Sequence, residues 1–488
     1  MTTADQNRTT ELAATCPRRW PALFVMLCAA FMDLLDVTIV NIALPAVRDD
    51  LGASFASAQW VITAYTLAFG LGLITGGRLG DRYGRKQLFL AGVAVFTAAS
   101  LLCGLAQSPG MLIGSRALQG LAAAVMIPQI MATVYAIFPP GERAGASGAY
   151  GGVTGLAAVL GPVLGGVFVT YDVFGLGWRA IFLVNIPLGI AALFAAAGLV
   201  PENSADHPLR MDLVGMGLVS VSVLCALYPL VQGGDAGWPG WMVALLVASP
   251  FVLALYAWHA GAKERRDGSS LIPMRLFAGR GFSVGAAVLF TFAVVMIGFF
   301  LAVSLTLQIG LGFSAMKTGL LFLPWAIGTG VTSASSDALV GRFGRHLVTG
   351  GALVMAAGAL WFAIALSADS GWLDLGPALF VAGVGMGGVF GPAFTVAGAS
   401  VEARDAGAAS GTLSASLQIG NAAGAALLGV LFFEPLKDAA GQARADMFTE
   451  AFRSFSWFTI GGLVLVALVA QAMPRRVAGY ADADADAG

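Results

Sequence analysis

Charged residues are scarce in this chain of 488 amino acids. They make up 11% of the sequence, against about a quarter in soluble domains, so an ordinary soluble globular protein is excluded. The net charge of −1 leaves no positive field that could hold a nucleic acid. Four cysteines and three histidines lie far apart and fit neither a disulfide framework nor a metal site. We therefore expect no metal, inert cysteines, and surface positions for His207, His259 and His346.

Apolar residues are abundant instead, at 58% of the chain, with 65 glycines in addition. A bilayer-spanning helix needs about 20 such residues. The first run, which starts at Trp20, is too long for the apolar region of a cleavable signal. Runs bounded by charge, proline and glycine predict fourteen membrane-spanning helices, at 20–45, 57–79, 87–107, 111–136, 144–170, 179–200, 212–232, 241–261, 283–309, 317–340, 347–367, 374–399, 406–433 and 453–473.

The distribution of basic residues predicts the orientation. Cytoplasmic loops of membrane proteins are enriched in lysine and arginine. With the first tail in the cytoplasm, most of the 26 basic residues fall in cytoplasmic segments. The pattern favours an even number of spans in the cell membrane, with both termini cytoplasmic.

Two parts of the chain repeat each other. Leu79–Lys86 (LGDRYGRK) matches Leu339–His346 (LVGRFGRH), and Pro128 matches Pro392 at nearly the same offset. Parallel repeats of this kind are common in transporters. We expect an all-α fold with a cytoplasmic tail at 1–19, a six-helix bundle at 20–200, a two-helix insert at 201–265, a second six-helix bundle at 266–473 and a cytoplasmic tail at 474–488.

Charged side chains at membrane depth are rare and point to function. Asp33 and Asp36 share one face of the first helix, and Arg116 lies in the fourth at a depth that lets it reach Asp36. Burial favours the protonated form of a carboxylate and a nearby cation favours the ionised form, which suits proton coupling. The alternatives are a fixed Asp36–Arg116 ion pair and an Asp33 that is simply hydrated at a cavity mouth.

The segment 77–86 carries four cations and several glycines between the second and third helices. Its glycines are expected to permit a tight cytoplasmic turn. Its acid can bind a helix N-terminus or an arginine. We interpret it as a cytoplasmic latch between the two halves, although a purely topogenic cation cluster is the alternative; the residues concerned are Gly77, Asp81, Arg82, Gly84, Arg85 and Lys86.

Small residues and a proline punctuate the fifth helix. Small side chains let helices approach closely, and the proline bends the helix. Close packing is the simple interpretation; sealing one side of a cavity during alternation is the functional one. The residues are Gly148, Gly161, Pro162, Gly165 and Gly166.

These motifs together resemble the major facilitator superfamily, and within it the fourteen-helix drug:proton antiporters. The resemblance is carried by Leu35–Pro45, Gly77–Lys86, Arg116–Gly120, Gly161–Gly166 and Trp178–Pro187. It implies two six-helix bundles around a central cavity, without a cofactor and driven by the proton gradient. The sequence departs from the antiporter motif at Ala157, where the family usually has glycine. The second repeat lacks counterparts of Asp36, Asp81 and Arg116, which concentrates the coupling charge in the first.

We therefore predict a monomeric, proton-coupled antiporter that exports amphiphilic, aromatic or cationic drugs. Protonation of Asp36, assisted by Asp33, would release the substrate to the outside. Arg116 would adjust the proton affinity of Asp36. Aromatic contacts with the substrate are assigned to Phe31, Tyr65, Tyr150 and Trp325, although Tyr and Trp also form interfacial belts. A dedicated exporter of one natural product, proton-driven uptake and a non-transporting membrane receptor are the alternatives. A membrane enzyme is disfavoured, because no catalytic motif occurs.

Overall fold

The computed structural model describes residues 18–202, 212–267, 270–398, 401, 406–433, 436 and 443–474, and every regular element in these ranges is a helix. Cys16, His207 and most of both predicted tails lie outside them. The helices are Arg19–Leu51 (α2), Phe55–Tyr83 (α3), Arg85–Gly104 (α4), Pro109–Ile137 (α5), Pro140–Thr170 (α6), Ala180–Leu183 (α7), Asn185–Leu199 (α8), Leu213–Ala236 (α9), Gly240–Asp267 (α10), Arg280–Leu305 (α11), Ala315–Leu321 (α12), Leu323–Ala334 (α13), Ser336–Phe343 (α14), Arg345–Ala365 (α15), Trp372–Gly398 (α16), Ala406–Leu428 (α17) and Arg444–Ala470 (α19), with the π-helical turns Thr306–Gly310 (η4) and Gly429–Phe433 (η6).

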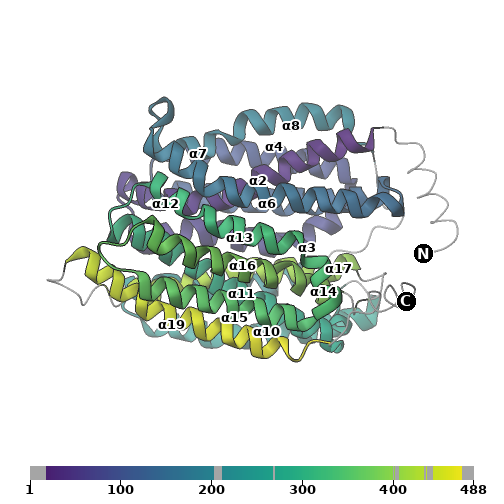
Figure 1. Cartoon of the computed structure of the whole chain (residues 1–488). Helices are drawn as coiled ribbons and strands as arrows, with labels where there is room; N and C mark the ends of the chain where they lie inside the picture. Colours follow the sequence, from purple (N-terminus) through teal and green to yellow (C-terminus); the bar gives the residue numbers. More distant parts are fainter. Residues whose placement is uncertain are drawn as a thin grey trace.

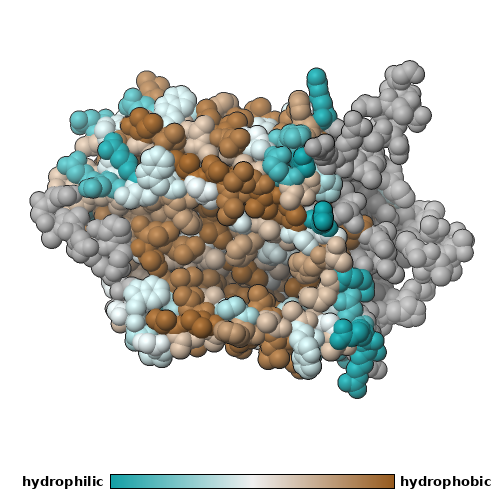
Figure 2. Space-filling model, turned by 90° about the horizontal axis from the view of Figure 1, so that it is seen from below, coloured by the Kyte–Doolittle hydropathy of each residue, from teal (hydrophilic) through white to brown (hydrophobic). Residues whose placement is uncertain are grey.

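Eleven helices in the described ranges are long and apolar enough to cross a membrane. Apolar side chains form a broad band across the middle of the surface in Figure 2, and hydrophilic ones gather toward its ends, as a bilayer requires. The chain is therefore an all-helical, polytopic membrane protein, as predicted. All fourteen expected segments coincide with helical stretches, but those of α3, α6 and α12–α14 are not among the eleven. The count of fourteen spans remains a prediction.

Local sequence sets the helix ends at one end of the bundle. The Ser54 hydroxyl accepts the backbone N–H of Ser57 at the start of α3, and Ser108 accepts that of Met111 at the start of α5. Gly52 ends α2 in the left-handed conformation, with φ of 59°, which glycine adopts without strain. These caps make the α2–α3 and α4–α5 connections short.

The helices pack as two groups. Helices α2, α3, α4, α5, α6 and α8 contact one another, and α11, α13, α15, α16, α17 and α19 form a second set of mutual contacts. In Figure 1, α2, α4, α6 and α8 lie above α11, α15, α16 and α19. The groups meet where α3 packs on α17 and where α6 packs on α12. The expected single span at 317–340 is wrong in one respect, because it is divided into α12, α13 and α14, with Pro324 in the first turn of α13.

Helices α9 and α10 pack against each other, and α9 also contacts α3 and α17. The α9–α10 pair therefore packs on the outside of the contact between α3 and α17, where the two groups meet. His259, expected at the surface, is instead partly buried, and its Nε2 lies 2.9 Å from Oδ1 of Asp212. Sequence spacing could not reveal this pairing, since 47 residues separate the two.

Candidate functional site

Asp36 on α2 and Arg116 on α5 meet in the interior, as the depth estimate predicts. Nη1 of Arg116 donates to Oδ2 of Asp36 in a salt bridge, and the two residues are 1% and 0% exposed. Nε of Arg116 donates to the carbonyl of Val61 at 3.2 Å, and its guanidinium carbon lies 4.1 Å from the ring centroid of Tyr65. The guanidinium is thus fixed by a carboxylate, a backbone carbonyl and an aromatic face.

Two buried amides complete the coordination of Asp36, and sequence reasoning did not name them. Nε2 of Gln119 and Nδ2 of Asn185 donate to Oδ1 of Asp36 at 2.9 and 3.0 Å. The same nitrogens donate to Oγ of Ser100 at 2.8 and 3.3 Å, and Oε1 of Gln119 accepts from Arg116 at 2.8 Å. Gln119 lies in the motif Arg116–Gly120 and Asn185 in the motif Trp178–Pro187. A polar amide side chain in an apolar helix is the sequence feature that could have identified them.

The network satisfies a charge that burial would otherwise penalise. A buried carboxylate is tolerated when it is paired and hydrogen-bonded, and Asp36 accepts from one guanidinium and two amides. Charge-assisted hydrogen bonds of this kind are the strong ones. The carboxylate of Asp36 is therefore fully hydrogen-bonded, and the network joins α2, α4, α5 and α8.

Asp33 lies one helical turn from Asp36 in a different environment. The Tyr65 hydroxyl donates to its Oδ1, and the residue is 7% exposed. Among the described side chains, no guanidinium or ammonium group forms a salt bridge with it. Within the same ranges, no cluster of three or more His, Cys, Asp or Glu side chains is placed to hold a metal ion.

The aromatic candidates do not form one cluster. Tyr65 joins Asp33 and Arg116, and Phe31 is half-buried on the same helix as Asp33. Tyr150 on α6 is partly buried against the core of the first group. Trp325 lies on α13 in the other group, with its ring stacked 5.5 Å from that of Phe299. The structure therefore does not bring Trp325 to the carboxylates.

The segment 77–86 is not a glycine-rich turn, which corrects the sequence prediction. Residues up to Tyr83 complete α3, and the chain reverses at Gly84 alone, where φ is 96°. A Cβ on Gly80 would lie 1.9 Å from Oε1 of Gln129 on α5, and one on Gly76 would lie 2.0 Å from a backbone carbonyl of the same helix. Gly80 therefore serves close packing between α3 and α5, as does Gly76 just before the segment, while Gly77 has only one distant neighbour at 3.8 Å.

The described contacts of this segment's cations lie within the first group. Arg85 donates to the carbonyl of Ala132 at 2.9 Å, and Nζ of Lys86 lies 4.0 Å from Glu202. Arg82 is exposed beside the ring of Tyr83. The side chain of Asp81 lies outside the described part, so the latch stays a hypothesis.

The small residues of α6 make the predicted close contacts. A Cβ on Gly161 would lie 1.9 Å from Oγ1 of Thr38, and one on Gly165 would lie 3.1 Å from Ile39 on α2. At the end of α6, a Cβ on Gly166 would lie 2.6 Å from Cα of Met316 on α12. Helix α6 therefore touches α2 through Gly161 and Gly165, and the second group through Gly166.

Pro162 contributes a further contact of the same kind, since a Cβ on Gly319 would lie 2.2 Å from its carbonyl oxygen. The proline lies inside the continuous helix α6. Gly148 also lies on α6, in a stretch whose neighbouring side chains are outside the described part. The contact between α6 and α12 is thus made backbone to backbone.

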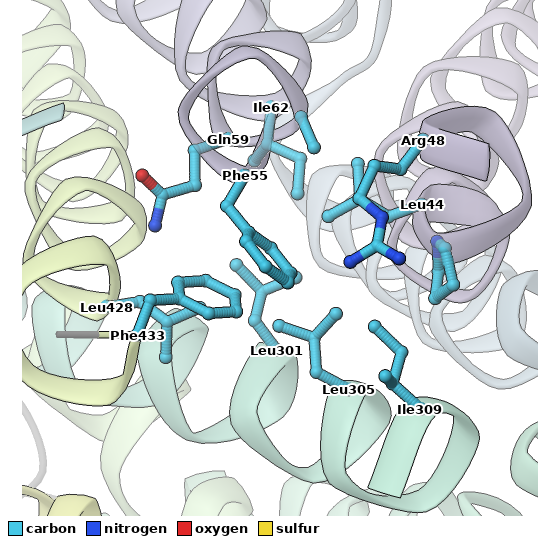
Figure 3. A pocket seen from close by; sticks show the side chains of 12 residues that line it. Leu44, Arg48, Phe55, Gln59, Ile62, Leu301, Leu305, Ile309, Leu428 and Phe433 are labelled. Carbon is cyan, nitrogen blue, oxygen red and sulfur yellow. The ribbon is translucent and has the colours of Figure 1, made fainter. Parts of the chain in front are cut away.

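A small pocket lies between the groups at the end where α2 finishes and α3 begins (Figure 3). The Phe55 and Phe433 rings stack there at 4.1 Å, and the Arg48 guanidinium carbon lies 4.6 Å from the Phe55 ring. The remaining space is about 10 Å³, roughly the volume one water molecule requires. The two groups are therefore closely packed at this pocket, and we call this end of the molecule the closed end. The lining residues are Leu44, Pro45, Arg48, Phe55, Ala58, Gln59, Ile62, Leu301, Leu305, Ile309, Leu428 and Phe433.

Comparison with known proteins identifies relatives along most of the chain. Residues 26–425 match the family model of the Major Facilitator Superfamily. The chain is 43% identical to a probable actinorhodin transporter of Streptomyces coelicolor, over 88% of this chain and 76% of that protein. It is 38% identical to a puromycin resistance protein of Streptomyces alboniger, over 84% and 81%. It is 34% identical to a tetracenomycin C resistance and export protein of Streptomyces glaucescens, over 86% and 77%.

Solved structures share the fold. A bacterial homologue of the human lysosomal transporter Spinster, in an inward-facing and occupied conformation, matches with a TM-score of 0.67 and 17% identity, over 93% of this chain and 96% of that one. A D-xylose–proton symporter matches with a TM-score of 0.65 and 14% identity, over 93% and 98%. The family match and the curated relatives confirm the prediction of a transporter rather than an enzyme.

Proposed function

Because the chain belongs to the Major Facilitator Superfamily, we propose that it exports amphiphilic small molecules from the cytoplasm in exchange for protons. The observation that carries the proposal is the buried charge cluster of Asp33, Asp36 and Arg116, since ionisable groups at membrane depth mark ion and substrate pathways. Relatives named for export of, or resistance to, antibiotics support the outward direction. No cofactor is required, because the proton gradient supplies the energy.

The proposed architecture has fourteen spans in the cell membrane, with both tails cytoplasmic, in a monomer. The two bundles at 20–200 and 266–473 rock against each other, and the insert at 201–265 accompanies them. With the tails in the cytoplasm, the closed end with Phe55 and Phe433 faces outward. In this proposal, substrate enters from the cytoplasm while that end is closed.

The contacts at the closed end suggest what must separate during export. The stack of Phe55 on Phe433 and the contact of Gly166 with Met316 both join the two groups there. Breaking them opens the outward path, and a proton that enters by it displaces the substrate from the carboxylate region. Closure of this end and release of the proton into the cytoplasm reset the carrier.

A dedicated exporter of a single natural product is the second candidate. It is favoured by relatives whose names each specify one compound, such as actinorhodin and tetracenomycin C. A growth test with puromycin, ethidium and tetraphenylphosphonium separates the two, because a multidrug exporter protects against chemically unrelated compounds. A dedicated exporter protects against one scaffold alone.

The test of proton exchange uses everted membrane vesicles with a preformed proton gradient. We expect puromycin or ethidium to accumulate in the vesicles and to dissipate the gradient, and a protonophore to abolish accumulation. Asp36→Asn is expected to abolish both effects, while Asp49→Asn, an exposed residue at the end of α2, should leave them intact. Accumulation that survives the protonophore would contradict proton coupling.

A further inference from the structure

The buried cluster on α2, α3 and α5 has an excess of negative charge. It contains two carboxyl groups, Asp33 and Asp36, and one guanidinium, Arg116, which stays protonated at any working pH. With both carboxyls ionised, the cluster carries one uncompensated negative charge in a region with little water. An uncompensated buried charge is strongly destabilising. When two carboxyl groups share such a site, the repulsion between their negative charges disfavours ionisation of both, so one retains a proton.

Hydrogen bonding decides which acid retains it. Asp36 accepts from Arg116, Gln119 and Asn185, all of which are donors that favour a carboxylate. Asp33 has one hydrogen-bond donor among the described groups, the neutral hydroxyl of Tyr65. Its second carboxyl oxygen has no donor there. A proton on that oxygen neutralises the cluster without breaking the Asp36–Arg116 pair.

We propose that Asp33, and not Asp36, holds the proton that is exchanged for substrate. This inference rests on the proposed function and divides the two acids by role. Asp36 is a positioning residue: through its salt bridge it holds Arg116 in place beside Tyr65, the donor to Asp33. The sequence prediction gave Asp36 the leading role, because it belongs to the recognised helix motif.

The surroundings of Asp33 contain few other ionisable groups. Those that act on it electrostatically are Asp36 on its own helix, Tyr65 on α3, Arg116 on α5 and Tyr150 on α6. The two tyrosines are neutral at physiological pH. Arg116 is engaged by Asp36, so no described cation is available to hold Asp33 ionised.

Asp33 is also slightly more accessible than Asp36. Asp36 is 0% exposed and Asp33 is 7% exposed. The helix positions beside Asp33 are partly accessible, since Leu34 and Val37 are half-buried. Protonation adds one hydrogen to the free carboxyl oxygen, and release returns it to water, while Tyr65 keeps its hydrogen bond to the other oxygen.

Infrared spectroscopy of the purified full-length protein in lipid tests this assignment without any substrate. A protonated carboxyl group gives a carbonyl stretch that carboxylates lack, and the band has different positions for Asp and Glu. The pH range lies above about 6, where exposed Asp and Glu, whose ordinary pKa values are close to 4, are already ionised. We expect a band in the wild type that falls as pH rises. Asp33→Glu should move the band and Asp33→Asn should remove it, whereas Asp36→Glu should leave its position unchanged.

The opposite pattern overturns the proposal: a band that follows Asp36→Glu and ignores Asp33→Glu, or no titrating band in the wild type. A transport measurement supplies the second readout. In proteoliposomes, Asp33→Asn is expected to retain puromycin–puromycin exchange across the membrane and to lose pH-driven accumulation. If Asp33→Asn loses both the exchange and the pH-driven accumulation while its unfolding temperature is unchanged, the proposal is also overturned. Absence of proton-driven transport in the wild type would defeat the proposed function, while the infrared assignment is decided separately.

Discussion

The amide of Asn185 donates a hydrogen bond of 3.0 Å to Oδ1 of Asp36, although 149 residues separate them in the chain. Asn185 is the first residue of α8, and Asp36 lies in the middle of α2. The bond therefore ties the last helix of the first group to its first helix. It is also one of the three side-chain hydrogen bonds that Asp36 accepts, together with those from Arg116 and Gln119.

Asn185→Ala is expected to destabilise the protein, because it removes a donor from a fully buried carboxylate. A buried polar group that loses its partner costs about 1–3 kcal/mol. Thermal unfolding in detergent, followed by intrinsic fluorescence, measures the effect. The control is Asn421→Ala, since the half-buried Asn421 donates only a long bond of 3.4 Å to Gln418. Equal unfolding temperatures for Asn185→Ala and the wild type would show that the network does not depend on this amide.

The sequence was sufficient to predict the helices and the meeting of Asp36 with Arg116. Apolar run length decides where helices can span a bilayer, and a rise of about 1.5 Å per residue fixes the depth of each charge. Few charges are present, so few pairings were possible. Apolar run length and the position of a charge along a helix depend only on the order of residues in the chain, so the sequence is enough to predict them.

The partners of Asp36 and the role of the 77–86 glycines could not be predicted in the same way. Amide partners depend on how helices rotate about their axes, which sequence period alone leaves open. Gly80 was interpreted as a turn residue, but it faces Gln129 on α5 at a distance that only a missing Cβ allows. Glycine permits both a turn and close packing, and the choice is made by the neighbouring helix.

The stack of Phe55 on Phe433 is expected to hold the outer end closed. Phe433→Ala removes an aromatic pair worth about 1 kcal/mol, which corresponds to a roughly fivefold larger open population. Proteoliposomes loaded with ethidium should therefore leak faster, without a gradient, than those with the wild type. Phe251→Ala provides the control, since Phe251 on α10 is 70% exposed. A leak of the same size in both variants would mean that the stack is not part of a gate.

Asp212 is expected to make the insert sensitive to acid. Burial raises the pKa of Asp212, but hydrogen bonds from His259 and from the backbone N–H groups of Gly215 and Leu271 outweigh it, so this pKa lies below its usual value of 3.8. A carboxyl group with a lowered folded-state pKa stabilises the fold above its ordinary pKa, and that contribution disappears as pH falls through the folded value.

Asp212→Asn should therefore lower the unfolding temperature at pH 7, by the equivalent of about 1 kcal/mol. The amide oxygen can still cap Gly215, but the charge that strengthens the contacts with His259 and the N–H of Leu271 is lost. The difference from the wild type should shrink as pH falls below about 4. Differential scanning fluorimetry across this range measures it, with Asp49→Asn as the exposed control. A difference that stays constant with pH would contradict the role assigned to the ionised carboxylate.

Gly166→Ala is expected to prevent full closure of the outer end. The added Cβ would lie 2.6 Å from Cα of Met316 and 2.8 Å from the carbonyl oxygen of Ala315; both are backbone atoms, which cannot rotate away as a side chain can. The helices must then separate, so the reporter Leu305→Cys, at a position that lines the pocket and is 3% exposed, should react faster with a membrane-impermeant thiol reagent. The experiment uses a background with the four native cysteines replaced by alanine. Gly198→Ala is the matched control, because a Cβ there meets nothing within 4 Å. Unchanged labelling in Gly166→Ala would show that α6 and α12 can close without this contact.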